Sequence, residues 1–199
     1  LINDISANKI ALPDLQRPYV WDRARVRDLF DSLFRGYPTG LLLFLENETE
    51  QQKRSIGRKE DLKRIPNYVV IDGQQRLTSL YAVFTWYPVL KENKEPEVIV
   101  LSFNPLTAEF SVADASTEKG YDWIYDIKEI LSGENLFNIT SDYLRSFKER
   151  YGDNPEVEKV IANNIQKLCN LWKQAFTVME ISKNLRIEEV SDIFLRINI

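Results

Sequence analysis

The segment Asp72-Gly73-Gln74-Gln75-Arg76 has the residue types and the setting of a phosphate-binding turn. It follows an apolar run at residues 68–71, which predicts a short buried strand, and it precedes a helical pattern. The first turn of a helix presents unpaired backbone N–H groups and the positive end of the helix dipole. Gly73 would let a ligand approach the backbone closely, and Arg76 could reach forward to clamp phosphate oxygens. We therefore predict that this turn binds phosphate.

The other side chains of this segment suggest hydrolytic chemistry. Asp72, at the end of the strand, is suited to hold magnesium or to orient an attacking water. Gln74 and Gln75 can position water or phosphate without adding charge. A structural alternative is a tight turn in which Asp72 caps the helix and Gln75 is its capping-box partner. The spacing alone leaves both interpretations open.

Two further segments contain polar groups of the same kind. In Gln16-Arg17-Pro18-Tyr19-Val20-Trp21, Arg17 supplies a second anion-binding fork, while Tyr19 and Trp21 offer flat rings on which a base could stack. The structural alternative is that both rings pack as a hydrophobic staple on the following helix. In Ile193-Phe194-Leu195-Arg196-Ile197-Asn198, Asn198 is a metal ligand or, as the spacing favours, a simple helix cap.

The composition excludes several classes of chemistry. The 199 residues contain no histidine and one cysteine, Cys169, so histidine-dependent nucleophiles and zinc sites built from histidine or thiolates are ruled out. Carboxylates, amides, Arg, Lys, Tyr and a hard cation such as magnesium remain. The net charge of -4 argues against a strongly basic nucleic-acid surface over the whole chain. No apolar run reaches about 18 residues and no signal peptide is visible, so we expect a cytoplasmic protein without membrane spans.

Apolar periodicity predicts the elements that hold these segments. Asp22 is a good N-cap for a helix that ends at Gly36, and Asn154 starts another helix whose inward stripe includes Val160 and Trp172. Strands are predicted at 40–46, 68–71 and 176–181, a hairpin at 98–103 and 109–113, an exposed loop at 47–67, and further helices at 74–87, 126–132, 141–151 and 188–198. The predicted fold class is α+β, with a small mixed sheet, flanking helices and a helical C-terminal portion.

Taken in this order, the three segments resemble the GmrSD-type restriction endonuclease N-terminal domain family. The matching pieces are Gln16-Arg17-Pro18-Tyr19-Val20-Trp21, Gly36-Tyr37-Pro38-Thr39-Gly40 after the first long helix, Val70-Ile71-Asp72-Gly73-Gln74-Gln75-Arg76-Leu77-Thr78, and Ile193-Phe194-Leu195-Arg196-Ile197-Asn198. They span nearly the whole chain, and the DGQQR string at a strand-to-helix turn is the most specific part. The resemblance implies a ParB/sulfiredoxin-like fold, in which the corresponding strand-turn-helix binds nucleotide phosphates.

The resemblance also implies roles for individual residues. Asp72, Gln74, Gln75 and Arg76 would form the hydrolytic core, with Asp72 as the magnesium ligand. The nucleotide-binding set would add Gln16, Arg17, Tyr19, Gly73, Thr78 and Asn198. Tyr19 and Trp21 match an aromatic loop that senses modified DNA in some members. The implied organisation is a nucleotide-binding core at 1–120, a helical insertion or subdomain at 121–175, and a strand and helix at 176–199 that return to the core, with the chain cut before an expected C-terminal nuclease region.

Three functional hypotheses follow. The first is a magnesium-dependent nucleoside triphosphatase that regulates a DNA-cutting domain or partner subunit in a restriction or phage-defence nuclease. Under this hypothesis, the chain contains no nuclease active site of its own. The protein could also form homo-oligomers. The second is a non-catalytic DNA-recognition module that senses modified DNA. A purely structural domain, which would bind neither ligand, is a third alternative.

Overall fold

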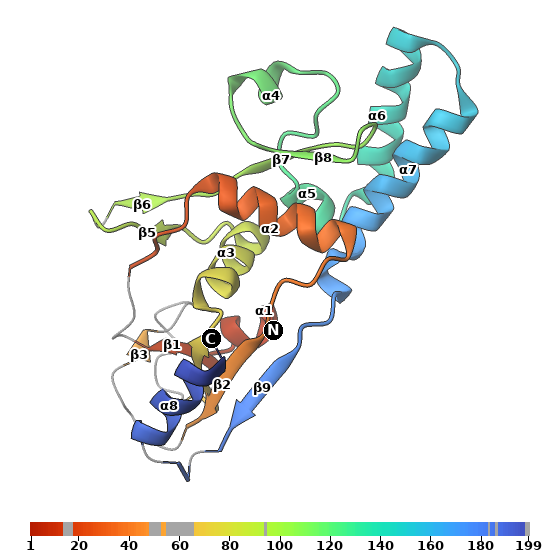
Figure 1. Ribbon diagram of the computed structural model, residues 1–199. Helices are drawn as coiled ribbons and strands as arrows, with labels where there is room; N and C mark the ends of the chain where they lie inside the picture. Colours follow the sequence, from red (N-terminus) through yellow and green to blue (C-terminus); the bar gives the residue numbers. More distant parts are fainter. Residues whose placement is uncertain are drawn as a thin grey trace.

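The computed structural model describes residues 1–13, 18–47, 53–54, 66–93, 95–182, 184–185 and 187–197. Figure 1 shows the order of the elements along the chain. The helices are α1 (Ile2–Ser6), α2 (Arg23–Arg35), α3 (Gln74–Thr85), α4 (Ala115–Lys119), α5 (Lys128–Leu131), α6 (Leu136–Tyr151), α7 (Pro155–Cys169), the 3-10 helix η2 (Asn170–Lys173) and α8 (Ile187–Ile197). The strands are β1 (Ile10–Pro13), β2 (Leu42–Glu46), β3 (Lys53–Arg54), β4 (Tyr68–Asp72), β5 (Val89–Leu90), β6 (Pro96–Glu97), β7 (Leu101–Asn104), β8 (Glu109–Val112) and β9 (Val178–Ile181).

One mixed sheet contains strands from both ends of the chain. Its order is β3-β1-β4-β2-β9. β4 lies in the centre, parallel to β1 and antiparallel to β2, and β9 pairs in parallel with β2. Helices pack around this sheet, so the predicted α+β class is confirmed.

The sheet separates two hydrophobic clusters. Because side chains alternate along a strand, Leu42 and Phe44 of β2 lie on the face that packs against α1 and α3, whereas Leu43 lies on the opposite face. On that opposite face, Leu43 and Ile181 pack with Val190 of α8. The central strand that leads to Asp72 is therefore supported by helices on both sides.

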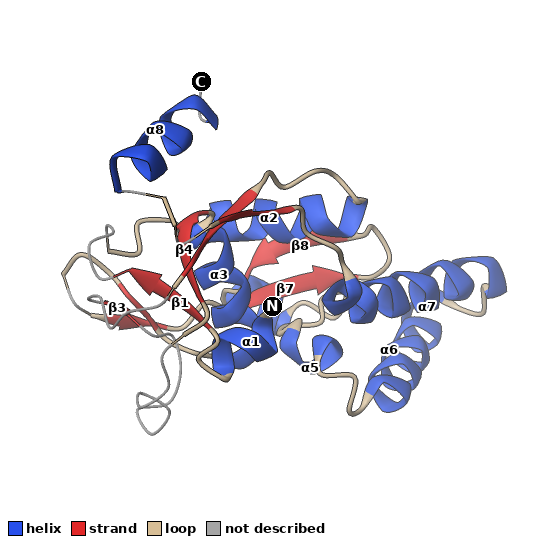
Figure 2. Cartoon of the chain, turned by 90° about the horizontal axis from the view of Figure 1, so that it is seen from below, coloured by secondary structure: helices blue, strands red, loops and turns tan. Residues whose placement is uncertain are grey.

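A larger cluster lies beyond the sheet, among α2, α3 and the helices α5, α6 and α7. It joins the apolar stripe of α2, which includes Phe30 and Phe34, to the β7–β8 hairpin and to α5, α6 and α7. Figure 2 shows α6 and α7 side by side at the end of the molecule opposite α8. α3 runs between these regions: Leu77 and Tyr81 belong to the sheet cluster, and Leu80 and Val83 to the larger one.

The helix boundaries follow local chemistry at several predicted positions. The Asp22 side chain accepts a hydrogen bond from the backbone N–H of Arg25, and α2 ends at Gly36 in the left-handed conformation, with φ +75°. The Asn154 side chain accepts from the N–H of Val157 at the start of α7. These predicted caps are confirmed.

Other boundaries differ from the prediction. α6 begins at Leu136, five residues before the predicted start at 141. α7 ends at Cys169, and the tighter η2 turn then leaves the Trp172 side chain 62% exposed, so its predicted inward position is wrong. Val160 is also exposed, because α7 packs through the narrower face that carries Ile161 and Ile165.

Some elements were not predicted from the sequence. α4 and the β5–β6 hairpin lie in segments whose apolar pattern is too short to show a period. Most of the predicted loop at 47–67 lies outside the described residues. Within the part of the chain that is described, no helix has the length and apolar character that a bilayer crossing requires.

Candidate phosphate-binding site

The turn between β4 and α3 is the predicted strand-to-helix junction. Gly73 occupies the N-cap position of α3 in the left-handed conformation, with φ +88°. A bulge in the β2–β4 pairing lies just before it, since Leu43 pairs with Asp72 but Phe44 pairs with Val70. The Leu77 N–H donates to the Gly73 carbonyl over 2.9 Å, which closes the first turn.

No described side chain caps α3. The structural alternative, in which Asp72 is the N-cap and Gln75 its capping-box partner, is therefore wrong, because Gly73 holds the cap position and has no side chain to accept a hydrogen bond. Among the described residues, no side chain gives the amide hydrogens of the first turn the kind of acceptor that Asp22 supplies to α2.

Gly73 is required by the packing behind the turn as well as by its positive φ. A Cβ at this position would lie 2.3 Å from Cδ2 of Leu42 and 3.2 Å from Nη2 of Arg76. The sequence-based expectation is that the glycine allows a ligand to approach closely. On the side where a Cβ would project, atoms of Leu42 and Arg76 lie close to the backbone, so these side chains take the place expected for a ligand.

The two glutamines bind main-chain groups. Gln74 is buried, and its Nε2 donates to the Val70 carbonyl over 3.2 Å. The Oε1 of Gln75 accepts from the N–H of Val20 over 3.0 Å. Gln75 therefore connects the first turn of α3 to the segment of residues 18–21.

Arg76 points toward the segment that enters β2. Its Nη1 donates to the Thr39 carbonyl over 2.5 Å, and its Nη2 donates to the Leu41 carbonyl over 2.6 Å. Nη2 also lies 3.3 Å from Oδ2 of Asp72. The Arg76 side chain is 16% exposed and the Asp72 side chain 34% exposed. Arg76 was expected to point toward a phosphate at the start of α3. Its guanidinium instead binds two backbone carbonyls and a carboxylate of the protein.

Tyr19 lies beside the same helix but is buried. Its hydroxyl lies 2.8 Å from Oγ of Ser79, and Nζ of Lys91 lies 5.0 Å from the centroid of its ring. Burial, partly offset by the Ser79 hydrogen bond, raises the pKa of Tyr19 to about 12. Trp21 is partly buried against the large hydrophobic cluster. Of the two alternatives, this arrangement favours packing over an open stacking surface, most clearly for Tyr19.

An ion network links the segment around Trp21 and Arg23 to the β5–β6 hairpin. Nζ of Lys91 donates to the Trp21 carbonyl over 2.6 Å and lies 3.0 Å from Oε2 of Glu97. Nε of Arg23 lies 2.6 Å from Oε1 of Glu97. Burial acts to raise the pKa of Glu97, but the hydrogen bonds from Lys91 and Arg23 outweigh it and hold the pKa below its ordinary value.

The structure thus brings together Asp72 to Arg76 and Tyr19 at the start of α3, and Thr78 lies partly buried at the beginning of the second turn. Gln16, Arg17 and Asn198 lie outside the described residues. Sequence reasoning missed the carbonyls of Thr39 and Leu41. The glycines and proline at 36–40 signalled a turn, but nothing in their pattern indicated contact with Arg76.

The described ranges contain no group of three or more His, Cys, Asp or Glu residues that could hold a metal ion. Asp72 ends β4 and directly precedes Gly73, the N-cap of α3, so within the described ranges it offers a single carboxylate there and not a cluster.

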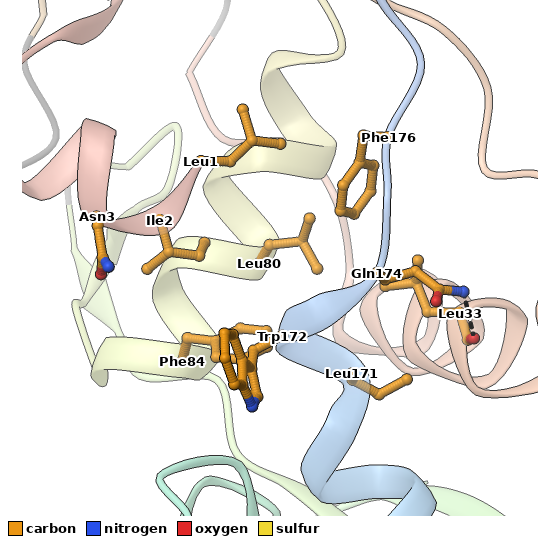
Figure 3. Close-up of a pocket in the computed structure, with 10 residues that line it drawn as sticks. All are labelled: Leu1, Ile2, Asn3, Leu33, Leu80, Phe84, Leu171, Trp172, Gln174 and Phe176. Atoms are coloured by element: carbon orange, nitrogen blue, oxygen red, sulfur yellow. Dashed lines mark hydrogen bonds between the residues drawn. The ribbon is translucent and has the colours of Figure 1, made fainter.

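A separate cavity of about 440 Å³ lies farther along α3 and includes none of the predicted site residues. Figure 3 shows its lining, which is mainly apolar: Leu1, Ile2, Asn3, Leu33, Leu80, Phe84, Leu171, Trp172, Gln174 and Phe176. These walls offer no charged side chain to an anion, so the cavity does not compete with the α3 start as a phosphate site.

Comparison with known proteins identifies the family. The family described as GmrSD restriction endonuclease, N-terminal domain, matches residues 1–199. An uncharacterized protein of Methanocaldococcus jannaschii is 29% identical over 219 aligned positions, which cover 100% of this chain and 38% of that relative. The chain therefore spans well under half the length of this curated relative. On the family match over its whole length, the chain belongs to the GmrSD restriction endonuclease N-terminal domain family.

Proposed function

We propose that this domain binds a nucleoside triphosphate at the start of α3 and hydrolyses it, and that this regulates the DNA-cutting part of a restriction or phage-defence nuclease. One observation carries the proposal: the left-handed turn at Gly73 leads into a helix that no described side chain caps, directly beside the Asp72 carboxylate. Membership of a restriction endonuclease family supports the biological setting.

The physical basis is the attraction of an anion to the start of a helix. The first amide hydrogens and the helix dipole together amount to roughly half a positive charge at this end. A phosphate group would accept hydrogen bonds from the amides of the first α3 turn. Gln75 and Ser79, through their bonds to Val20 and Tyr19, hold residues 18–21 beside this turn and connect it to the segment that carries Gln16 and Arg17.

Asp72 is the residue best suited to hold magnesium. Magnesium sites in nucleotide-binding proteins commonly use one or two carboxylates together with substrate phosphates, so a single aspartate fits this role. When bound, the ion would neutralise charge on the phosphate oxygens. Asp72 would contribute one ligand and would itself be held in place by Arg76.

The remaining assignments follow from the family resemblance. Gln74, Gln75 and Arg76 would belong with Asp72 to the hydrolytic core, and Thr78, one turn into α3, would belong to the nucleotide-binding set. Arg17, Gln16 and Asn198 would complete the nucleotide site. Recognition of DNA by Tyr19 as an open stacking surface receives no support from its burial, so we do not propose DNA recognition as the main activity.

A thermal-shift panel tests the binding step. We expect one of ATP, GTP, CTP or UTP, with MgCl2, to raise the melting temperature of the full-length protein. At a free concentration of about 100 times Kd, the added stability is about 2.7 kcal/mol, or on the order of 5–10 °C for a domain of this size. No shift with any nucleotide, together with salt-sensitive DNA binding, would contradict the proposal and favour a DNA-recognition module.

Phosphate release tests the catalytic step. Asp72→Asn should abolish hydrolysis, because the magnesium ligand is lost. Asp31→Asn is a matched control, since Asp31 pairs with Arg35 at the same i,i+4 spacing and is 32% exposed. The control should hydrolyse nucleotide at the wild-type rate. Wild-type turnover by Asp72→Asn would exclude Asp72 from the site.

A further inference from the structure

We infer that Arg76 is a positioning residue, which holds residues 39–41, the β2 entry segment, and the Asp72 carboxylate against the start of α3 and does not itself contact phosphate. The inference rests on the nucleotide site proposed above, but the arrangement that it explains exists without any ligand.

The first argument comes from the hydrogen bonds of the guanidinium. Its two terminal nitrogens donate to carbonyls two residues apart, Thr39 and Leu41, and one of them also pairs with Asp72. A planar fork of N–H groups is suited to such a pair of acceptors, which a single ammonium group cannot match. These bonds engage three of the five guanidinium N–H groups and both terminal nitrogens, so the end of the side chain is already held by the protein.

The second argument comes from the two glycines beside the guanidinium. A Cβ at Gly40 would lie 2.5 Å from Nη1, and a Cβ at Gly73 would lie 3.2 Å from Nη2. Both glycines have positive φ, +91° and +88°. The atoms within 4 Å of a Cβ at Gly40 all belong to Arg76, whereas at Gly73 Leu42 comes closer than the guanidinium, at 2.3 Å. Gly40 is therefore the glycine that this side chain explains directly, and Gly73 adjoins the same contact.

The contact has a direct consequence for the site. β2 pairs with β4 next to Asp72, and Arg76 joins the segment that enters β2 to the carboxylate that ends β4. Without the guanidinium, the two carbonyls lose their donor and Asp72 loses its counter-charge. The magnesium ligand would then no longer be held in one position, so nucleotide binding would weaken although no phosphate contact had been removed.

Hydrogen exchange in the nucleotide-free, full-length protein tests the inference independently of the proposed function. Arg76→Lys and Arg76→Ala should both speed amide exchange in peptides covering residues 37–43, by at least about threefold, because local opening becomes easier. Exchange in α7 should not change. If Arg76 served only a phosphate, the ligand-free exchange of residues 37–43 would match wild type, and the inference would be overturned.

Gly40→Ala keeps every charge and provides a second variant. It should speed exchange in the same peptides more than Gly36→Ala, because Gly36 has a similar positive φ (+75°) but open space within 4 Å of the point that a Cβ would occupy. In an Arg76→Ala background, the excess effect of Gly40→Ala should disappear. An excess of the same size in both backgrounds would show that the guanidinium is not what the glycine accommodates.

Nucleotide affinity provides the functional readout. With MgATP and MgGTP as probes, Arg76→Lys should bind about as weakly as Arg76→Ala, since a lysine keeps the charge but not the fork. Affinity restored by lysine would indicate a direct charge contact with phosphate. Failure of the wild-type protein to bind either probe would refute the nucleotide site alone, because the exchange results do not depend on it.

Discussion

Each polar side chain that follows Gly73 in this turn binds a main-chain group from another part of the structure. Gln74 binds β4, Gln75 binds residue 20, and Arg76 binds the β2 entry segment. A buried amide left without its partner costs about 1–3 kcal/mol. Alanine substitutions here would therefore mix lost stability with lost binding, and more conservative changes are needed to separate the two.

Gln75→Glu is such a change. The carboxylate keeps an oxygen that can accept from the Val20 N–H, and a negative charge in the first turn of a helix is stabilising by about 0.3–1 kcal/mol. Folding should be preserved or improved. A bound triphosphate, however, would be repelled, and we expect Kd to rise by about tenfold or more, which is about 1.4 kcal/mol. Isothermal titration calorimetry, with the nucleotide that stabilises the wild-type protein, measures the Kd of both proteins.

The control for this substitution is Gln166→Glu, which adds the same charge on the exposed surface of α7. It should leave nucleotide affinity unchanged. Equal affinities of wild-type and Gln75→Glu proteins would mean that the anion does not bind at the first turn of α3.

At the scale of the elements, residues 19–21 before α2 are held to α3 and to the β5–β6 hairpin by contacts between residues far apart in the sequence. Tyr19 binds Ser79, Val20 binds Gln75, and the Trp21 carbonyl binds Lys91. Glu97 in β6 then joins Lys91 to Arg23 at the start of α2. The β5–β6 hairpin thus helps to hold the segment around Trp21 and Arg23.

The pH dependence of stability tests this ion network. The pKa of Glu97 is lowered in the folded protein, so its contribution is present above the ordinary value of 4.5 and is lost as pH falls through the lowered pKa. We expect Glu97→Gln to destabilise the protein by about 1–2 kcal/mol at pH 7. The difference from wild type should shrink below pH 4.5 in urea denaturation curves. Glu134→Gln, at an exposed glutamate, should show a much smaller difference.

Local signals predicted most elements, but long-range contacts were not readable from the sequence. Asp22, Gly36 and Asn154 act within one turn of themselves, and their caps were predicted correctly. Trp172 continued the periodic stripe of α7, and only the tertiary packing shows that the helix tightens after Cys169. The turn at Gly73 was likewise found from its pattern, whereas the partners of Arg76 lie 35 and 37 residues away.

At the scale of the whole molecule, α3 contacts regions that the predicted three-part organisation, with boundaries at residues 120 and 175, assigns to different parts. Its first turn forms the candidate site, its sheet-facing residues pack in the cluster with β2 and β4, and its other face packs with α2 and α5 in the larger cluster. Ile2 and Phe176 pack against both clusters. The three-part division remains a prediction, but the shared helix implies that its parts depend on one another for stability.

We therefore expect one cooperative unfolding transition for residues 1–199. Ile165→Ala in α7, where the side chain is fully buried, should cost about 2–5 kcal/mol. Val70→Ala in the sheet should lower the midpoint of the same transition. The reason is that α3 packs in both clusters, so unfolding of one cluster also removes packing from the other. Far-UV circular dichroism and tryptophan fluorescence should give coincident curves for both variants. Two separate transitions, with Ile165→Ala moving only one, would instead mark the helical part as an independent unit, and the site at the start of α3 would then be insensitive to changes in α7.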